Sequence, residues 1–148
     1  MGKKVTYERW INLFLPEGWH EREEMGFVLL EKDNWPGMIQ ISFIEREETR
    51  ATPSDAAKIY LEDTLEERDI PFPRDAIKIE NDGKIGKAVI DYTDKNAKDP
   101  THWRVWFLVD MTRAIMAAYI CDPGHDGHEL EEASGIIADL EFIESTND

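Results

Sequence analysis

Two consecutive segments in the second half of the chain are apolar on both of the faces that a β-strand presents. They span His102–Val109 and Arg113–Cys121, and only Asp110-Met111-Thr112 lies between them. A strand with two apolar faces is typical of the middle of a sheet that is covered on both sides. The sequence therefore predicts a central hairpin. Its first strand carries Trp103, Val105, Phe107 and Val109 opposite Trp106 and Leu108, and its second carries Ile115, Ala117 and Tyr119 opposite Met116, Ala118 and Ile120.

Further strands are predicted in the first half of the chain and around residue 82. Tyr7–Leu15 alternates with a period of two, and the strands Met25–Glu31 and Met38–Ile44 flank the turn-forming segment Asp33-Asn34-Trp35-Pro36-Gly37. Another hairpin joins Ile77–Glu80 to Lys84–Thr93, because Asn81-Asp82-Gly83 between them favours a tight turn.

Two helices are predicted from their start signals and apolar stripes. Thr52 is placed to cap the first helix, Pro53 fits its first turn, and Pro71-Phe72-Pro73 prevents its continuation. The second helix runs from about His128 to Leu140, and Asp126 with Glu129 has the spacing of a capping box at its start. The inward stripes are Ala57, Tyr60, Leu61, Thr64 and Leu65 in the first helix, and Leu130, Ala133, Ile137 and Leu140 in the second.

Length and composition fit one domain. A chain of 148 residues, 41% of them hydrophobic, can bury a sizeable core, and it contains neither a linker nor an internal repeat. We therefore expect a single α+β domain over residues 1–148, in which a mostly antiparallel β-sheet is sandwiched between helical layers.

Three short phrases carry a resemblance to a known family. They are Leu15-Pro16-Glu17-Gly18-Trp19, Met38-Ile39-Gln40-Ile41-Ser42 and Ala138-Asp139-Leu140-Glu141-Phe142-Ile143-Glu144. A strand that ends in Pro-x-Gly-Trp, a strand reading apolar-Gln-Ile-Ser, and a last helix that runs into an apolar tail together resemble the PsbP-like family. That family includes a photosystem subunit, a Ran-GTPase-binding factor and many bacterial domains. The resemblance implies a PsbP-like α/β/α sandwich that acts by binding, and it carries over no catalytic residue because the family has no shared catalytic motif.

The net charge of −15, from 17 basic and 32 acidic side chains, restricts the classes of partner. It argues against binding to a nucleic-acid backbone or an anionic membrane, and no stretch approaches the ~20 apolar residues of a membrane span. The N-terminal residues lack the apolar stretch of a signal peptide, and the single cysteine, Cys121, fits a reducing compartment. We therefore expect a cytoplasmic protein whose acidic surface either maintains solubility or meets a basic partner.

The densest group of reactive side chains lies between the last predicted strand and the second helix. Cys121, His125 and His128 offer sulfur and nitrogen ligands for zinc or a related ion. Structural explanations compete with this one, because the acids of the segment fit helix caps and a thiol at the end of a buried strand fits the core. The trio therefore defines the alternative hypothesis of a metal-binding or small-molecule-binding domain, while no cofactor is predicted outright.

Catalytic motifs are not found in the sequence. It contains no Gly-x-Ser-x-Gly elbow and no phosphate-binding glycine loop, and its carboxylate pairs are too numerous for one pair to be chosen as acid and base. We therefore expect a protein that is not an enzyme and has no catalytic residues.

Two features suggest where a protein partner would bind. Trp35 lies in a turn, where a tryptophan serves either as a binding anchor or as a cover for the edge of the sheet. The first helix carries like charges one turn apart, which form either a solvated face or a docking surface for a cationic partner. The favoured hypothesis is an accessory or immunity-type interaction domain that binds a basic protein through Trp35, Glu62, Asp63, Glu66 and Glu67. No oligomeric state is indicated.

Overall fold

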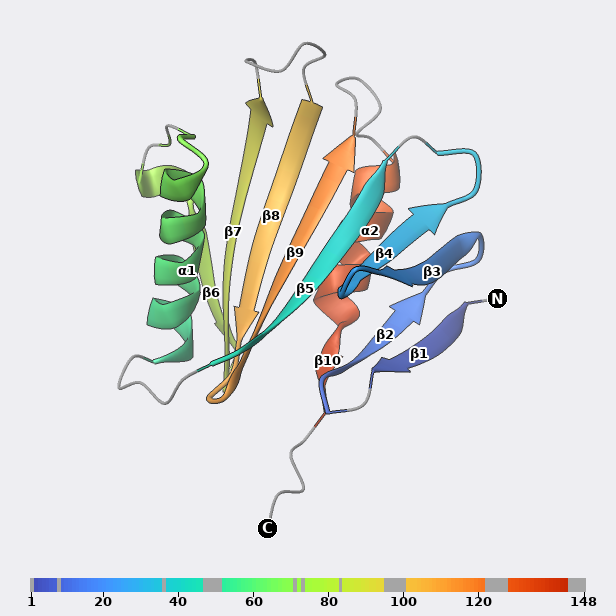
Figure 1. Ribbon diagram of the computed structural model, residues 1–148, viewed down its shortest axis with the longest axis horizontal. Coiled ribbons are helices and arrows are strands. Elements are labelled where there is room, and N and C mark those ends of the chain that lie inside the picture. The colour runs from blue at the N-terminus through green and yellow to red at the C-terminus, as the bar shows by residue number, and fades with distance from the viewer. Residues whose placement is uncertain are drawn as a thin grey trace.

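The fold is built on a seven-stranded antiparallel sheet with the order β3-β4-β5-β9-β8-β7-β6 (Figure 1). The computed structural model describes residues 2–7, 9–35, 37–46, 52–70, 72, 74–82, 84–94, 101–121 and 128–143. The strands are β3 (Trp19–Glu24), β4 (Phe27–Lys32), β5 (Met38–Glu45), β6 (Lys78–Asp82), β7 (Ile85–Asp94), β8 (Thr101–Val109) and β9 (Arg113–Cys121). A second sheet with the order β1-β2-β10 contains β1 (Lys3–Tyr7), β2 (Ile11–Leu15) and β10 (Glu141–Phe142).

The central hairpin predicted from its two apolar faces is confirmed as β8 and β9. Both strands lie inside the sheet, and their register pairs Trp106 with Ala117 and Phe107 with Met116. Two separate hydrophobic clusters form on the two faces. Val105, Phe107 and Val109 belong to one cluster, and Trp106, Leu108, Ile115, Ala117 and Tyr119 belong to the other.

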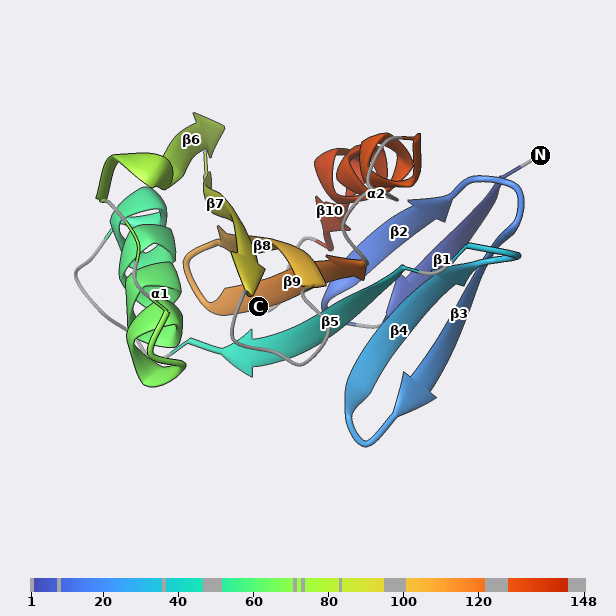
Figure 2. The same ribbon diagram turned by 90° about the horizontal axis from the view of Figure 1, so that it is seen from above.

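Two helices cover these clusters, α1 (Pro53–Glu67) and α2 (His128–Asp139). The side chain of Thr52 accepts a hydrogen bond from the backbone N–H of Asp55 at 3.2 Å, as expected for the N-cap, and Ala57, Leu61 and Leu65 of α1 are buried. Figure 2 shows α1 and α2 on opposite sides of the central sheet, with β1 and β2 on the same side as α2. Neither helix is long and apolar enough to cross a membrane, as far as the described part of the chain goes.

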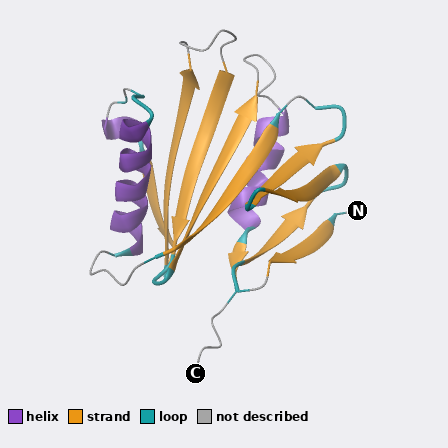
Figure 3. Ribbon diagram, viewed as in Figure 1, coloured by secondary structure: helices purple, strands orange, loops and turns teal. Residues whose placement is uncertain are grey.

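The predicted antiparallel sheet with two helices is confirmed, but the layers differ from the expectation. On the α2 side, Ile11, Leu13 and Leu15 of β2 share the hydrophobic cluster with the helix. That layer therefore combines a helix with a three-stranded sheet and is not helical throughout. The described part of the chain accordingly has more strands than helices, and Figure 3 colours the two apart.

In the first half of the chain one predicted strand is wrong and one strand was missed. The segment Tyr7–Leu15 is not one strand: β1 ends at Tyr7, the backbone turns at Arg9 with φ 71°, and β2 begins at Ile11. The strand β3 was not predicted, because its side chains beyond Trp19 are polar and it pairs only with β4 at the edge of the sheet. Met25 and Gly26, with φ 51° and 85°, form the tight turn between β3 and β4.

Candidate functional site

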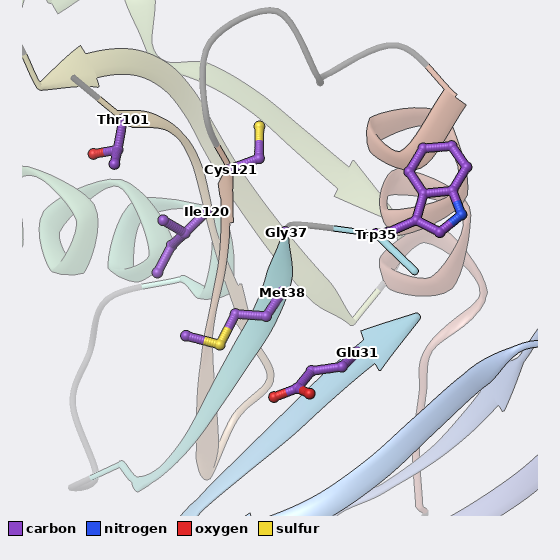
Figure 4. Close-up of a pocket in the computed structure, with 7 residues that line it drawn as sticks. All are labelled: Glu31, Trp35, Gly37, Met38, Thr101, Ile120 and Cys121. Atoms are coloured by element: carbon purple, nitrogen blue, oxygen red, sulfur yellow. The ribbon is translucent and has the colours of Figure 1, made fainter. Parts of the chain in front are cut away.

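A pocket of about 320 Å³ opens where the ends of four strands meet. The pairing of Met38 with Ile120 and of His102 with Cys121 brings the starts of β5 and β8 beside the end of β9. The turn after β4 closes the other side. The pocket is lined by Glu31, Trp35, Gly37, Met38, Thr101, Ile120 and Cys121, and Figure 4 shows Gly37 between Trp35 and Cys121.

The pocket unites one residue from each of two sites that the sequence suggested separately. Trp35 had been singled out as a partner anchor and Cys121 as a metal ligand, and both line the same cavity. Cys121 is buried, and Trp35 is half-buried. His125 lies outside the described residues, and for His128 only the backbone is described, as the first residue of α2. No group of three potential metal ligands occurs among the described residues, so the metal hypothesis stays a prediction.

Trp35 is held in place by a basic side chain that also contacts α2. The Nζ atom of Lys32 lies 4.5 Å from the centroid of the Trp35 ring, within cation–π range. The same atom lies 2.6 Å from Oε2 of Glu132, whose Oε1 accepts a 3.2 Å hydrogen bond from Nε1 of Trp19. This chain of contacts ties the turn between β4 and β5 to the helix, so Trp35 forms a positioned wall of the pocket.

A buried acid lies beside Gly37, another residue of the pocket lining. Glu129 and Tyr119 are both fully buried, and the Tyr119 hydroxyl donates a 2.5 Å hydrogen bond to Oε1 of Glu129. Burial, together with that hydrogen bond and the neighbouring thiol of Cys121, raises the pKa of Tyr119 far above its usual range. Within the described part of the chain, Oε2 of Glu129 has no hydrogen-bond partner.

Burial gives Glu129 a role that the sequence did not predict. Its capping box with Asp126 stays a prediction, because Asp126 lies outside the described residues, but its side chain is directed into the core. The position of Glu129 along α2 could have predicted its burial. Glu129 precedes Ala133 by four positions and Ile136 by seven, so it lies on the apolar stripe of the helix.

Gly37 explains how the pocket wall approaches the buried pair so closely. A Cβ atom at this position would lie 2.0 Å from Oε1 of Glu129 and 2.7 Å from the hydroxyl of Tyr119. At either distance the Glu129 or Tyr119 side chain would have to shift. Glycine therefore lets the start of β5 pass the Glu129–Tyr119 hydrogen bond without disturbing it.

The acidic residues predicted on the first helix form a separate surface. Asp63, Glu66 and Glu67 are exposed and Glu62 is half-buried, and none of the four side chains has an ion pair or hydrogen bond within the described residues. Ile59, which is 50% exposed, lies on the same side one turn earlier. Because α1 packs on β7 and β8 while the Trp35 turn lies beyond β5, the structure does not bring Trp35 and these acids together (Figure 1).

Comparison with known proteins identifies the fold. No family model matches the chain, and no curated protein matches it. A crystal structure from Bacteroides thetaiotaomicron VPI-5482 is similar with a TM-score of 0.70 and 20% identity. The match covers 97% of this chain, which spans about half (49%) of the length of that protein.

Two smaller proteins match over nearly their whole length. Cyanobacterial PsbP (CyanoP) from Synechocystis sp. PCC 6803 has a TM-score of 0.64 and 8% identity, covering 96% of this chain and 92% of its own. A mutant of the protein Mog1 has a TM-score of 0.57 and 12% identity, covering 98% and 97%. The chain therefore has the PsbP/Mog1-like fold, as the three sequence phrases predicted.

Proposed function

We propose that this protein of PsbP/Mog1-like fold is a cytoplasmic, non-enzymatic interaction domain that binds a basic protein partner through the outer face of α1. The observation that carries the proposal is the cluster of Glu62, Asp63, Glu66 and Glu67, none of which forms an ion pair within the described residues although Lys58 and Arg68 lie on the same helix or at its end. We call these four residues the acidic face.

The stability of α1 does not account for the acidic face. Glu66 and Glu67 lie in the last turn, where the helix dipole disfavours negative charge, and no basic residue occupies that turn. Arg68, the nearest cation in sequence, lies instead over the ring of Trp103 at 5.6 Å. Carboxylates that repel one another and oppose the dipole are better explained by a partner that supplies the missing positive charge.

Ile59 gives the acidic face an apolar contact point. Interfaces commonly combine a desolvated apolar contact with charges at the rim, and such charges accelerate association more than they strengthen the final complex. The proposal therefore requires that binding weakens as salt screens the acidic face, because the Debye length falls to about 8 Å at 0.15 M ionic strength.

The test uses a variant that neutralises the acidic face: Glu62→Gln, Asp63→Asn, Glu66→Gln and Glu67→Gln. Proteins captured from a lysate at low salt by the unaltered protein are compared with those captured by this variant. We expect a basic protein to be recovered by the unaltered protein at low salt, to be lost at high salt, and to be lost with the variant.

A second variant separates local from general charge effects. Glu45→Gln, Glu131→Gln, Asp139→Asn and Glu141→Gln remove four charges from exposed positions on β5, α2 and β10. This variant should capture the same partner as the unaltered protein. Equal losses with both variants, or no loss with either, would contradict the proposal.

The pocket beside Cys121 supports a second candidate function, the binding of a small molecule or a metal ion. Its supporting observation is that Trp35 and Cys121, suggested independently by the sequence, line one cavity. A ligand or metal that occupies it should raise the melting temperature. Trp35→Ala should abolish the shift caused by a small molecule, and His125→Ala should abolish the shift caused by zinc. A panel of metals and metabolites without any shift would rule out this function.

A further inference from the structure

A second pocket, of about 370 Å³, lies where β1 and its following turn meet the β3–β4 hairpin. Three neighbouring aromatic rings, those of Tyr7, Trp10 and Phe43, belong to its lining. The Phe43 ring centroid lies 5.9 Å from that of Tyr7 and 5.1 Å from that of Trp10, and the rings are tilted by 45° and 42°. The lining residues are Thr6, Tyr7, Trp10, Glu23, Gly26, Phe27, Val28 and Phe43, and we call this cavity the aromatic pocket.

Two exposed apolar side chains lie at or beside the aromatic pocket. Phe27, which lines it, is 39% exposed, and Met25, next to the lining residue Gly26, is 91% exposed. Met25 and Gly26 have positive φ angles and form the tight turn at the tip of the β3–β4 hairpin. Exposed apolar residues around a cavity mark a surface that binds a partner.

The polar groups of the aromatic pocket select the charge of its occupant. Glu23 is exposed and has no ion pair within the described residues, whereas its neighbour Glu21 is paired with Lys3 at 2.9 Å. The hydroxyl oxygen of Tyr7 is buried and has no hydrogen-bond partner within the same residues. Burial, followed by the charges of Glu21 and Glu23, raises the pKa of Tyr7 to about 12.

These groups fit one kind of ligand. An anion would be repelled by Glu23, and an apolar group would leave the Tyr7 hydroxyl unsatisfied. A cation is attracted by the aromatic faces and by the carboxylate. Of the two side chains that are cationic at neutral pH, arginine, unlike lysine, has a planar group that stacks on rings and several N–H donors that can reach two acceptors.

We propose that the aromatic pocket binds an arginine side chain of a basic protein, which packs against the rings of Trp10 and Phe43 and bonds to the carboxylate of Glu23 and the hydroxyl of Tyr7. This inference rests on the proposed function only in that a basic protein supplies the arginine. The aromatic pocket and the acidic face lie at opposite ends of the sheet, so the two contacts are tested separately. The volume suits it, because about 370 Å³ lies near the lower end of the roughly 300–1,000 Å³ of small-ligand sites.

The test titrates blocked arginine (N-acetyl-arginine methylamide) into the ¹⁵N-labelled protein and follows the indole N–H signal of Trp10, assigned with Trp10→Phe. We expect a saturable shift of that signal. Blocked citrulline, which has nearly the same shape without the charge, should produce none, and blocked lysine should bind more weakly than arginine.

Variants assign the binding to the polar groups. Glu23→Gln and Tyr7→Phe should each weaken arginine binding by roughly two- to five-fold. The control Glu24→Gln removes the same charge from the next residue of β3, which is already paired with Arg22, and it should leave the affinity unchanged. The inference is overturned if the Trp10 signal does not saturate, if citrulline or lysine binds as tightly as arginine, or if Glu24→Gln acts like Glu23→Gln.

The result of the arginine titration does not depend on the result of the capture experiment that tests the acidic face. Neutralising Glu62, Asp63, Glu66 and Glu67 should not change the affinity for blocked arginine. If that variant loses the partner while blocked arginine fails to bind, the proposed function stands and the arginine site is overturned. If blocked arginine binds but no variant loses a partner, the pocket is supported and the acidic face is not.

Discussion

Single side chains decide how the region behind the Trp35–Cys121 pocket is held together. The side chain of Glu129 is fully buried, and within the described residues its hydrogen bond comes from the hydroxyl of Tyr119. A buried polar group is costly without a partner, so each member of the pair is needed by the other. Gly37 completes the arrangement, because only a residue without a side chain can pass the pair at this distance.

Tyr119→Phe should lower the free energy of unfolding by about 1–3 kcal/mol, because it leaves the acceptor oxygen of Glu129 buried without its donor. Urea unfolding followed by tryptophan fluorescence measures this loss. Glu131→Gln, on the exposed side of the same helical turn, is the control and should change stability by less than about 0.5 kcal/mol. Equal effects of the two substitutions would show that the buried hydrogen bond does not stabilise the protein.

Tyr119 should also remain protonated at a pH at which free tyrosine ionises. Its raised pKa means that the phenol contributes stability below the unfolded value of about 10, and this contribution is lost as the pH rises towards the folded value. The increase in phenolate absorbance between about pH 9 and 11 should therefore be the same in the intact protein and in Tyr119→Phe. A smaller increase in the variant would mean that Tyr119 titrates normally.

At the scale of secondary-structure elements, α1 and β7 approach each other so closely at Gly86 that a side chain there would meet the backbone of the helix. A Cβ on Gly86 would lie 2.2–2.4 Å from backbone atoms of Pro53 and Ser54 at the start of α1. Backbone atoms cannot move aside as a flexible side chain can, so the helix and the strand are locked at this point.

Gly86→Ala should therefore destabilise the protein by more than about 1 kcal/mol, because the first turn of α1 must shift away from the sheet. Gly135→Ala is the matched change within α2, where an added Cβ meets nothing within 4 Å. It should stabilise the protein by about 0.5–1 kcal/mol, since alanine is the better helix former. Thermal unfolding of both variants measures the contrast, and a stabilising Gly86→Ala would show that the two elements are not in tight contact.

The elements also show which sequence signals were sufficient. The Thr52 cap, the central hairpin and the acidic helix were predicted because each is encoded by neighbouring residues. The strand β3 was missed because its polar side chains face solvent at the edge of the sheet, where no alternation is required. The turn at Arg9 was missed because Tyr7–Leu15 keeps an alternating pattern across a break in the backbone.

The net charge of −15 affects the molecule as a whole. Like charges destabilise the compact state through mutual repulsion, and salt screens this repulsion. The acidic face makes the effect local, because Glu62 with Glu66 and Asp63 with Glu67 are like pairs one turn apart.

Neutralising the acidic face should therefore make the protein more stable. Relief of two like-charge pairs at about 0.2–0.5 kcal/mol each, combined with the helix dipole, should raise the melting temperature by about 1–4 °C at low salt. The gain should shrink as salt is added. A lower melting temperature for the variant would show that these acids stabilise the fold and would remove the main support for a binding role.

Local and periodic information in the chain was enough to specify the central strands, the two helices, the acidic charge and the resemblance that indicated the fold. Such features depend on residues within a few positions of one another, where spacing alone defines a face or a cap. The functional regions depend on contacts between distant residues. Three arrangements follow from strand register and packing, which only the tertiary structure establishes. Trp35 and Cys121 line one pocket, Glu129 is buried against Tyr119, and Trp10, Phe43 and Glu23 line a second pocket.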